Sequence, residues 1–425
     1  MGGKDKKVKK RTVAALTGAL ALGLVVAVGS ASAAVAGAAG SLDPTYGTGG
    51  VALIPGDNSF IGGATFAANG DLLIAEGSGV VAVRPNGTPD IGFGSGGFAS
   101  TGLTNAGPGD VAVQSDGKIV WVGGGQIPGD TNTADTFAVA RFTAAGTLDP
   151  AFGVGGLVST SFPAEPVSDV ANTVLLQPDG KILVGGQAGI SRRGILLFAA
   201  MVRLNPNGSL DTSFGTGGKV VNTANDLAIS ALGLDAAGDI FTLPVPAEYD
   251  SSGHADATVT RTALSTTAQG GMIGSGVPAV FMPDGRGLVT GSGGGIGRCD
   301  ADVEVQRFLG ATPDPSFAVT PIDFSGTEGC TRDGARGIAV QPDGKVLVVG
   351  SCFHGPNGFL LARLTAAGAL DTGFGTNGVV VSAIGANGQS LADTILVQPD
   401  GKILVIGTAT DAAGNGDLAV ARYLP

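Results

Sequence analysis

The segment Gln398-Pro399-Asp400-Gly401-Lys402 recurs along the chain and decides its fold. Identical copies stand at residues 177–181 and 341–345, and looser copies at 67–71, 114–118, 235–239 and 282–286. The spacing runs from 47 residues (70 to 117) to 63 residues (117 to 180), which is the range of repeat architectures. Seven repeats follow, marked by Gly70, Gly117, Gly180, Gly238, Gly285, Gly344 and Gly401.

Each repeat is predicted to form four short strands, called a to d. Asp400-Gly401 tolerates the positive φ of a tight hairpin, so it joins strand a (392–398) to strand b (403–406). Strand c ends in an arginine, and Leu-Asp-x-x-Phe-Gly, clearest at 148–153, 210–215 and 370–375, leads into strand d. No window shows helical periodicity, so we predict an all-β, seven-bladed β-propeller. The seven arginines are Arg84, Arg141, Arg203, Arg261, Arg307, Arg363 and Arg422.

An arginine and an aspartate stand eight residues apart across the turn between strands c and d. We expect these residues to share a sheet face and form a structural ion pair rather than an anion-binding ring. The pairs are Arg141 with Asp149, Arg203 with Asp211, and Arg363 with Asp371.

The ends of the chain are expected to close the ring. Residues 42–54 begin as a strand d, and the chain stops just after a strand c, so the N-terminal strand should complete the last blade. Asp43 should then pair with Arg422. The fourth repeat shows no Leu-Asp-x-x-Phe-Gly after Arg261, so we expect it to lack its own ion pair and to open most easily.

The first 33 residues have the order of a secretory signal peptide. Lys4 to Arg11 are rich in basic residues, 12–28 are uncharged and mostly apolar, and Ala31-Ser32-Ala33 suits cleavage. A single membrane anchor is the alternative, although the apolar run is short for one. We therefore expect a secreted, extracellular protein made of a signal peptide (1–33), a linker (34–41) and the propeller (42–425).

Composition excludes several classes of protein. With 75 Gly and 22 Pro but no Gly-X-Y period the chain is not collagen, and 43% hydrophobic against 14% charged residues argues against disorder. The net charge is −11, and loss of residues 1–33 leaves 18 basic and 34 acidic residues, or 18 − 34 = −16. Such a surface repels phosphate, so we expect no nucleic-acid partner and, after signal cleavage, no membrane span.

The markers Gln-Pro-Asp-Gly-Lys-Ile-Leu-Val, Ala-Arg-Phe/Tyr and Leu-Asp-x-x-Phe-Gly-x-x-Gly resemble the delta-60 repeat family of bacterial exported β-propellers. The resemblance covers about residues 42–425. That family carries no catalytic motif, so the resemblance implies fold and compartment. The wider class of propellers with a Pro-Asp-Gly hairpin includes lactonases, which motivates an alternative function.

Chemistry is sparse in the sequence. There is no zinc motif, nucleophile elbow or P-loop, and the acidic loops 130–135 and 411–417 do not match a calcium-binding EF-hand. Strand a should line the central channel, where Asp110, Asn172 and Asp393, with Thr173, Arg336 and Thr394 beside them, are candidate metal ligands at one mouth. The alternative is that they are solvated rim residues.

We therefore expect a non-catalytic interaction or ligand-binding module, monomeric and without a cofactor. Its binding face is expected to be the one formed by the b-to-c loops and d-to-a links, which vary in length, as at 123–136 and 246–257. The partner would be an extracellular protein, a glycan or a small ligand. The alternative is a metal-dependent hydrolase of lactonase-like type, using Ca²⁺ or another divalent metal.

All three cysteines fall in loops or links of this same variable face. The preferred expectation is one disulfide between Cys330 and Cys352, with Cys299 to Cys330 as the second choice. Three unpaired thiols are the alternative.

Overall fold

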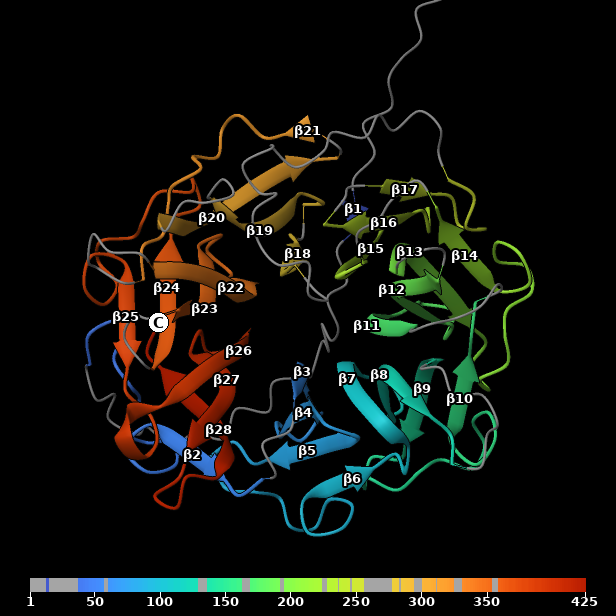
Figure 1. Cartoon of the computed structure of the whole chain (residues 1–425), viewed down its shortest axis with the longest axis horizontal. Helices are drawn as coiled ribbons and strands as arrows, with labels where there is room; N and C mark the ends of the chain where they lie inside the picture. The colour runs from blue at the N-terminus through green and yellow to red at the C-terminus, as the bar shows by residue number, and fades with distance from the viewer. Residues whose placement is uncertain are drawn as a thin grey trace, which may run out of the picture.

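The chain forms a ring of β-sheet blades around a central axis (Figure 1). Five of the sheets are one propeller blade each, and an eight-stranded sheet contains blades five and six. The innermost strands surround the axis, and successive blades follow one another in chain order. This computed structural model describes residues 13–14, 37–56, 60–128, 136–162, 169–191, 195–223, 228–235, 237–244, 247–255, 277–282, 284–293, 300–310, 312–324, 331–353 and 358–425.

The first three blades are four-stranded antiparallel sheets, in which strands a to d run from the axis outward. The predicted hairpins are present: Gly117 and Gly180 both take φ +83°, as the turn between strands a and b requires. The strands are β3 (Ile61–Phe66), β4 (Leu72–Glu76), β5 (Gly79–Val83) and β6 (Phe98–Ser100) in blade one; β7 (Thr104–Val113), β8 (Ile119–Gln126), β9 (Thr136–Phe142) and β10 (Leu157–Thr160) in blade two; and β11 (Val170–Leu176), β12 (Ile182–Ser191), β13 (Ile195–Leu204) and β14 (Lys219–Asn222) in blade three.

Blades six and seven repeat this order. The one short 3₁₀ turn among the described residues, Ala386–Gly388, lies on the link between them. The strands are β22 (Thr331–Val340), β23 (Val346–Phe353), β24 (Phe359–Leu364) and β25 (Val379–Ser382) in blade six, and β26 (Ser390–Val397), β27 (Ile403–Thr410), β28 (Gly416–Tyr423) and β2 (Val51–Ile54) in blade seven.

Blade seven is closed by the N-terminal strand, as predicted. Strand β2 pairs with β28 in the register Val51 to Ala421 through Ile54 to Leu418, and Leu42 bridges Tyr423. The two ends of the chain are therefore joined by a backbone ladder, and this blade has no unpaired c-strand edge.

The strands of blade four differ from the predicted repeat. Its third strand is β17 (Ala247–Tyr249), after β15 (Ala231–Asp235) and β16 (Ile240–Leu243), and the turn that follows contains Gly253 at φ +86°. The prediction that strand c ends at Arg261, with 246–257 as a b-to-c loop, was wrong. Arg261 lies outside the described residues. The arginine marker misled because Glu248 occupies the structural position that Arg203 has in blade three.

The inner edge of blade four also pairs with β1 (Val13–Ala14). Blade five contains β18 (Ala279–Phe281), β19 (Gly287–Gly293) and β20 (Asp300–Leu309), with the short β21 (Thr312–Pro313) paired to β20. A parallel pairing of Asp300 with Thr331 and Ala301 with Arg332 joins this blade to blade six.

The hydrophobic cores lie between neighbouring blades rather than within one sheet. Between blades two and three, for example, Phe152 and Val139 pack with Val184 and Val202, all of them buried. Because each core needs two blades, the stability of every blade depends on its neighbours.

Candidate functional site

The predicted channel-mouth residues lie at a repeated irregularity of the innermost strands. In blades one, two, three, six and seven the pairing of strand a with strand b shifts register at the same place in the repeat. Such β-bulges re-aim side chains and are common beside binding sites. The shifts fall at Gly62-Gly63, Gly109, Asn172, Arg336 and Asp393.

Glycines at two of these bulges let neighbouring blades approach closely. A Cβ atom on Gly109 would lie 2.0 Å from the Ala171 carbonyl oxygen, and one on Gly63 would lie 2.0 Å from Asp110 Oδ1. No larger residue fits at either place without movement of the backbone or of the carboxylate. Blades one, two and three therefore meet through backbone and through the Asp110 side chain.

Asp110 lies between the inner strands of three blades. Its Oδ2 accepts a hydrogen bond from the Val174 backbone N–H at 3.2 Å and a long one from the Thr173 hydroxyl at 3.5 Å. Burial raises its pKa to about 6, against the lowering effect of hydrogen bonds from Val111, Val174 and Thr173.

Asp393 and Arg336 form a separate pair between blades six and seven. Arg336 Nη1 lies 3.2 Å from Asp393 Oδ1, with the arginine side chain 46% exposed and the aspartate 15% exposed. Burial raises the pKa of Asp393 to about 6, although the charge of Arg336 and its hydrogen bond act in the opposite direction.

Asn172 has a third environment. Its Nδ2 donates to the Ile229 carbonyl at 3.3 Å, at the entrance to blade four. Asp110, Asn172 and Asp393 thus each make contacts of their own, and none of these contacts joins two of the three. Within the described ranges, no group of three or more His, Cys, Asp or Glu side chains is arranged to hold a metal ion.

The raised pKa of Asp110 predicts a pH-dependent effect of Asp110→Asn. A folded-state pKa of about 6 against an ordinary 3.8 stabilises the fold below about pH 4, and this contribution is lost as the pH rises through 6. Asn has no charge to desolvate. The free energy of unfolding of Asp110→Asn, measured with urea and taken relative to the unmodified protein, should therefore rise between pH 4 and pH 8 by up to about 3 kcal/mol.

The control for this measurement is Asp343→Asn, at a side chain 55% exposed in a hairpin turn where Asn can accept the same backbone hydrogen bond. It should change the midpoint by similar amounts at both pH values. If the difference in the free energy of unfolding between Asp110→Asn and the unmodified protein stays constant from pH 4 to pH 8, the pKa of Asp110 is not raised by burial.

The predicted arginine–aspartate pairs lie at the opposite ends of the strands. Arg141 Nε donates to Asp149 Oδ2 at 2.9 Å, and the equivalent distances are 2.7 Å for Arg203 to Asp211 and 2.9 Å for Arg363 to Asp371. Arg422 Nε reaches Asp43 Oδ2 at 2.9 Å and so joins the two ends of the chain.

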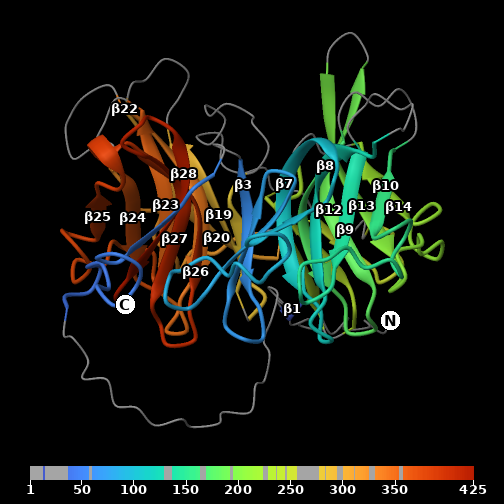
Figure 2. The same cartoon turned by 90° about the horizontal axis from the view of Figure 1, so that it is seen from below.

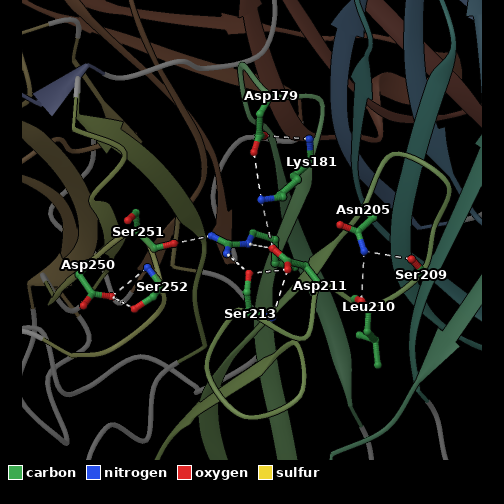
Figure 3. A network of polar contacts seen from close by, with 11 residues as sticks. Asp179, Lys181, Asn205, Ser209, Leu210, Asp211, Ser213, Asp250, Ser251 and Ser252 are labelled. Atoms are coloured by element: carbon green, nitrogen blue, oxygen red, sulfur yellow. Dashed lines mark hydrogen bonds and ion pairs between the residues drawn. The ribbon is translucent and has the colours of Figure 1, made fainter.

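Three parts of this arrangement were missed from the sequence. The lysine of the a-to-b hairpin approaches the same carboxylate: Lys181 Nζ lies 3.4 Å from Asp211 Oδ2 (Figure 3). The Arg203 guanidinium carbon lies 4.5 Å from the centroid of the Phe214 ring. Arg203 Nη1 also donates to the backbone carbonyl of Ser251, which belongs to the next blade. Figure 3 shows Ser251 beside Asp211 and Ser213. The regular co-occurrence of Lys, Arg and Asp with Phe or Tyr in the repeats of blades two, three, six and seven was the signal for this network.

We call this arrangement the blade latch: the Lys, Arg, Asp and aromatic residue of one blade with the turn of the next. A backbone bond completes it, as Gly153 N–H donates to the Asn207 carbonyl at 2.8 Å. Equivalent bonds are Gly94 to Ala145, Gly215 to Ser252, Ala318 to Ala367, Gly375 to Ala39 and Gly47 to Asn86.

Arg84 does not belong to the latch, although the sequence suggested that it is equivalent to Arg141. The Asp90 N–H donates to the Ala82 carbonyl, just as the Asp149 N–H donates to the Arg141 carbonyl. In blade one, therefore, Ala82 occupies the position that Arg141 has in blade two. Arg84 pairs with Asp90 from the turn, at 2.8 Å, with 49% of its side chain exposed. Arg307 does belong, with Asp314 at 2.8 Å, seven residues away rather than eight.

The expected disulfide falls largely outside the described part of the chain. Cys299 and Cys330 lie outside the described residues, and only the backbone of Cys352 is described, in β23 opposite Asp333. The loop 130–135 and His354 also lie outside them. The other histidine, His254, is exposed and contacts Ser252 Oγ at 2.7 Å in the turn of blade four.

These features define the class of protein: a seven-bladed β-propeller whose blades are joined by a repeated latch. A family model described as "Domain of unknown function (DUF5122) beta-propeller" matches residues 114–152, 177–214, 341–374 and 398–425. These segments lie in blades two, three, six and seven, where the hairpin lysine, the arginine and the aspartate are all present. No curated protein matches the sequence.

Solved structures share the fold at low sequence identity. A chain of the mitotic checkpoint complex superposes with a TM-score of 0.51 at 10% identity, covering 95% of this chain and 98% of that one. A protein of unknown function from Dyadobacter fermentans gives 0.47 at 11%, covering 88% and 98%. A gluconolactonase from Xanthomonas campestris gives 0.37 at 14%, covering 87% of each chain. The likeness extends to the propeller fold alone.

The described part of the chain contains no helix long and apolar enough to cross a membrane.

Proposed function

We propose that this chain is a bacterial, secreted, non-catalytic propeller that binds an extracellular protein, glycan or small ligand on its variable face. The variable face is the one formed by the b-to-c loops and the d-to-a links. The leader at residues 1–33 supports export, and the resemblance to delta-60 repeat proteins agrees with it.

The observation that carries the proposal is the difference between the two faces. On the face of the a-to-b and c-to-d turns, the repeated charged and aromatic residues bind the next blade in the latch. On the other face the connections between strands b and c differ from blade to blade, spanning 77–78, 127–135, 192–194 and 354–358. Variable loops on a rigid scaffold are where binding residues usually gather.

One connection stands out on this face. Strands β12 and β13 pair from Ile182–Leu204 to Ser191–Ile195, whereas β11 reaches only Gln187 and β14 only Ala199. The hairpin therefore extends beyond its own sheet, and Figure 2 shows it rising above the rest of the propeller. We expect a partner on this face to contact this hairpin.

The test uses the secreted chain, residues 34–425, immobilised and probed with a glycan array and with proteins of the native culture medium. In a trimmed variant, residues 189–197 are replaced by Asn-Gly, which suits a tight turn between the register partners Ala188 and Phe198. We expect any captured ligand to bind the trimmed variant at least about tenfold more weakly, a loss of about 1.4 kcal/mol or more.

The control carries Ala144→Ser and Ala145→Ser in the exposed c-to-d turn of blade two, on the latch face. It should bind as the unmodified protein does. Equal loss in both variants, or no captured ligand, would contradict the proposal. Hydrolysis of esters or lactones that depends on added divalent metal and is abolished by Asp393→Ala would favour the hydrolase alternative instead.

A further inference from the structure

In blades two and three, one continuous segment forms the turn between strands c and d, and the turn has the same form in both. In blade two the Thr143 N–H donates to the Thr147 carbonyl at 2.8 Å, and the Gly146 N–H donates to the Thr143 carbonyl at 3.0 Å. Gly146 takes φ +80°, which glycine adopts without strain. The equivalent residues of blade three are Asn205, Ser209 and Gly208, the last at φ +87°.

In blade seven the same turn is divided between the N-terminal and the C-terminal segment. The C-terminal segment comes from strand β28, and residues 37–41 lead toward β2. The Leu424 N–H donates to the Ser41 carbonyl at 2.9 Å, and the Gly40 N–H donates to the Leu424 carbonyl at 3.0 Å. Gly40 takes φ +84°. Both hydrogen bonds of the turn are therefore made, but here they join two segments that are distant in the sequence.

Pro425 occupies the position of the turn proline of blade three. A Cβ atom on Gly401, in the a-to-b hairpin of blade seven, would lie 3.6 Å from Pro425 Cβ. A Cβ atom on Gly180, the equivalent glycine of blade three, would lie 3.4 Å from Pro206 Cγ. Both prolines therefore cover the hairpin glycine of their own blade at the same place in the repeat.

Ala39 occupies the next position of the turn, although it belongs to the N-terminal segment. Its carbonyl accepts the latch hydrogen bond from the Gly375 N–H at 3.1 Å. In blade three the acceptor of this bond is the carbonyl of Asn207, 2.8 Å from the nitrogen of Gly153. Asn207 directly follows the turn proline of its blade. Within the repeat, Ala39 therefore stands one peptide bond after Pro425.

The sequences of the two segments agree with this assignment. Residues 38–43 read Ala-Ala-Gly-Ser-Leu-Asp, and residues 144–149 of blade two read Ala-Ala-Gly-Thr-Leu-Asp. When residues 422–425 are placed before residues 39–43, the combined run Arg-Tyr-Leu-Pro-Ala-Gly-Ser-Leu-Asp is identical to residues 203–211 at six of nine positions. The shared residues include the Arg and Asp of the latch and the Pro and Gly of the turn.

We infer that residues 422–425 and 39–43 together form an ordinary c-to-d turn with one peptide bond missing, so that a bond from Pro425 to Ala39 makes the propeller a continuous ring. Each blade contacts only its neighbours, so the chain ends can be placed in another c-to-d turn at little cost. Because the turn lies on the latch face, the chain before Ala39 leaves the ring opposite the variable face.

Residues 34–38 are not needed for such a ring. The Ala38 carbonyl accepts from the Ser41 N–H at 2.9 Å and from the Ser41 hydroxyl at 2.6 Å, at an exposed site. Water can take the place of this carbonyl, so omission of the segment costs little stability.

The test is a rearranged chain in which residues 207–425 are followed directly by residues 39–206. It contains the proposed bond and moves the chain ends to the equivalent bond of blade three, between Pro206 and Asn207. We expect this chain to elute as a monomer and to melt within about 3 °C of the chain 34–425.

Two variants of the rearranged chain test the new bond itself. Omission of Ala39 joins Pro425 to Gly40 and removes the acceptor of the Gly375 N–H. The melting temperature should then fall by at least about 5 °C, and the Gly375 amide should exchange faster with solvent. Insertion of a flexible Gly/Ser hexapeptide between Pro425 and Ala39 should not stabilise the chain relative to the direct bond.

Three results would overturn the inference. In the first, the directly joined chain melts more than about 3 °C below the chain with the inserted hexapeptide. In the second, the chain without Ala39 is as stable as the directly joined chain. In the third, none of the rearranged chains folds, which would show that the turn of blade three is not equivalent to the divided turn of blade seven.

Discussion

Deletion of residues 34–55 converts the monomer expected for this propeller into a protein that aggregates and melts at a lower temperature. The deletion removes β2, which exposes the edge of β28 over residues 418–421, and removes Asp43, which leaves the buried guanidinium of Arg422 without its carboxylate. Breaking a buried ion pair from one side costs about 3–5 kcal/mol. Together with the lost strand, we expect the melting temperature to fall by about 10 °C or more.

The matched control is a chain that begins at Gly37. It keeps Ala39, whose carbonyl accepts from Gly375, and it keeps the whole of β2. Its melting temperature and its elution volume in size-exclusion chromatography should equal those of the chain beginning at residue 34. A monomeric elution profile and an unchanged melting temperature for the longer deletion would show that the N-terminal strand does not close the ring.

Arg203→Ala is expected to lower the free energy of unfolding by about 2–4 kcal/mol, measured by urea unfolding. Arg203 is 5% exposed, and its guanidinium binds Asp211, the ring of Phe214 and the carbonyl of Ser251 in blade four. Lys181 remains near the carboxylate, which keeps the loss below that of a fully unpaired buried charge. Arg203→Lys should recover only part of the loss, because an ammonium cannot make the same fork of hydrogen bonds.

Arg84→Ala provides the comparison at a solvent-exposed arginine. Its side chain is 49% exposed and its pair with Asp90 lies in a turn, so its removal should cost less than about 1 kcal/mol. If Arg84→Ala and Arg203→Ala lower the free energy of unfolding equally, then burial of the latch does not account for its contribution to stability.

The pH dependence provides an independent check on Arg203→Ala. Burial raises the pKa of Asp211, but hydrogen bonds from Ser213 and the pairing with Arg203 outweigh it and lower the pKa to about 2. A lowered folded-state pKa stabilises the fold above the ordinary value of 3.8, and this contribution is lost as the pH falls toward 2. The difference in the free energy of unfolding between the unmodified protein and Arg203→Ala should therefore become smaller as the pH falls from 4 to 2.

Most of the architecture could be predicted from local sequence. The Asp-Gly hairpins and apolar runs predicted the strands and their order, because positive φ at glycine and strand alternation are properties of a few consecutive residues. The repeat count gave seven blades, and the register of the two ends gave the pairing of β2 with β28. Blade four was misread because Glu248 replaces the arginine, and a marker later in the sequence was taken in its place.

The candidate site could be predicted only in part. Position within the repeat puts Asn172, Arg336 and Asp393 at one level of the innermost strands, with Asp110 one residue further on, and the register shifts fall at this level. The glycines at 62, 63 and 109 were a signal for the bulges found there. Which side chain pairs with which was not encoded locally, because Asp110 binds blade three while Asp393 binds Arg336 of blade six.

The sequence by itself therefore determined the number of blades, the order of strands and the ends that meet, since these follow from turn chemistry and from repetition. Only the tertiary structure decided how blades hold one another. The carboxylate of Asp211, for example, gathers Lys181 and Arg203 from its own blade, while that arginine reaches Ser251 in the next. Such contacts depend on the distance and angle between two packed sheets, which closure of the ring sets and no single repeat specifies.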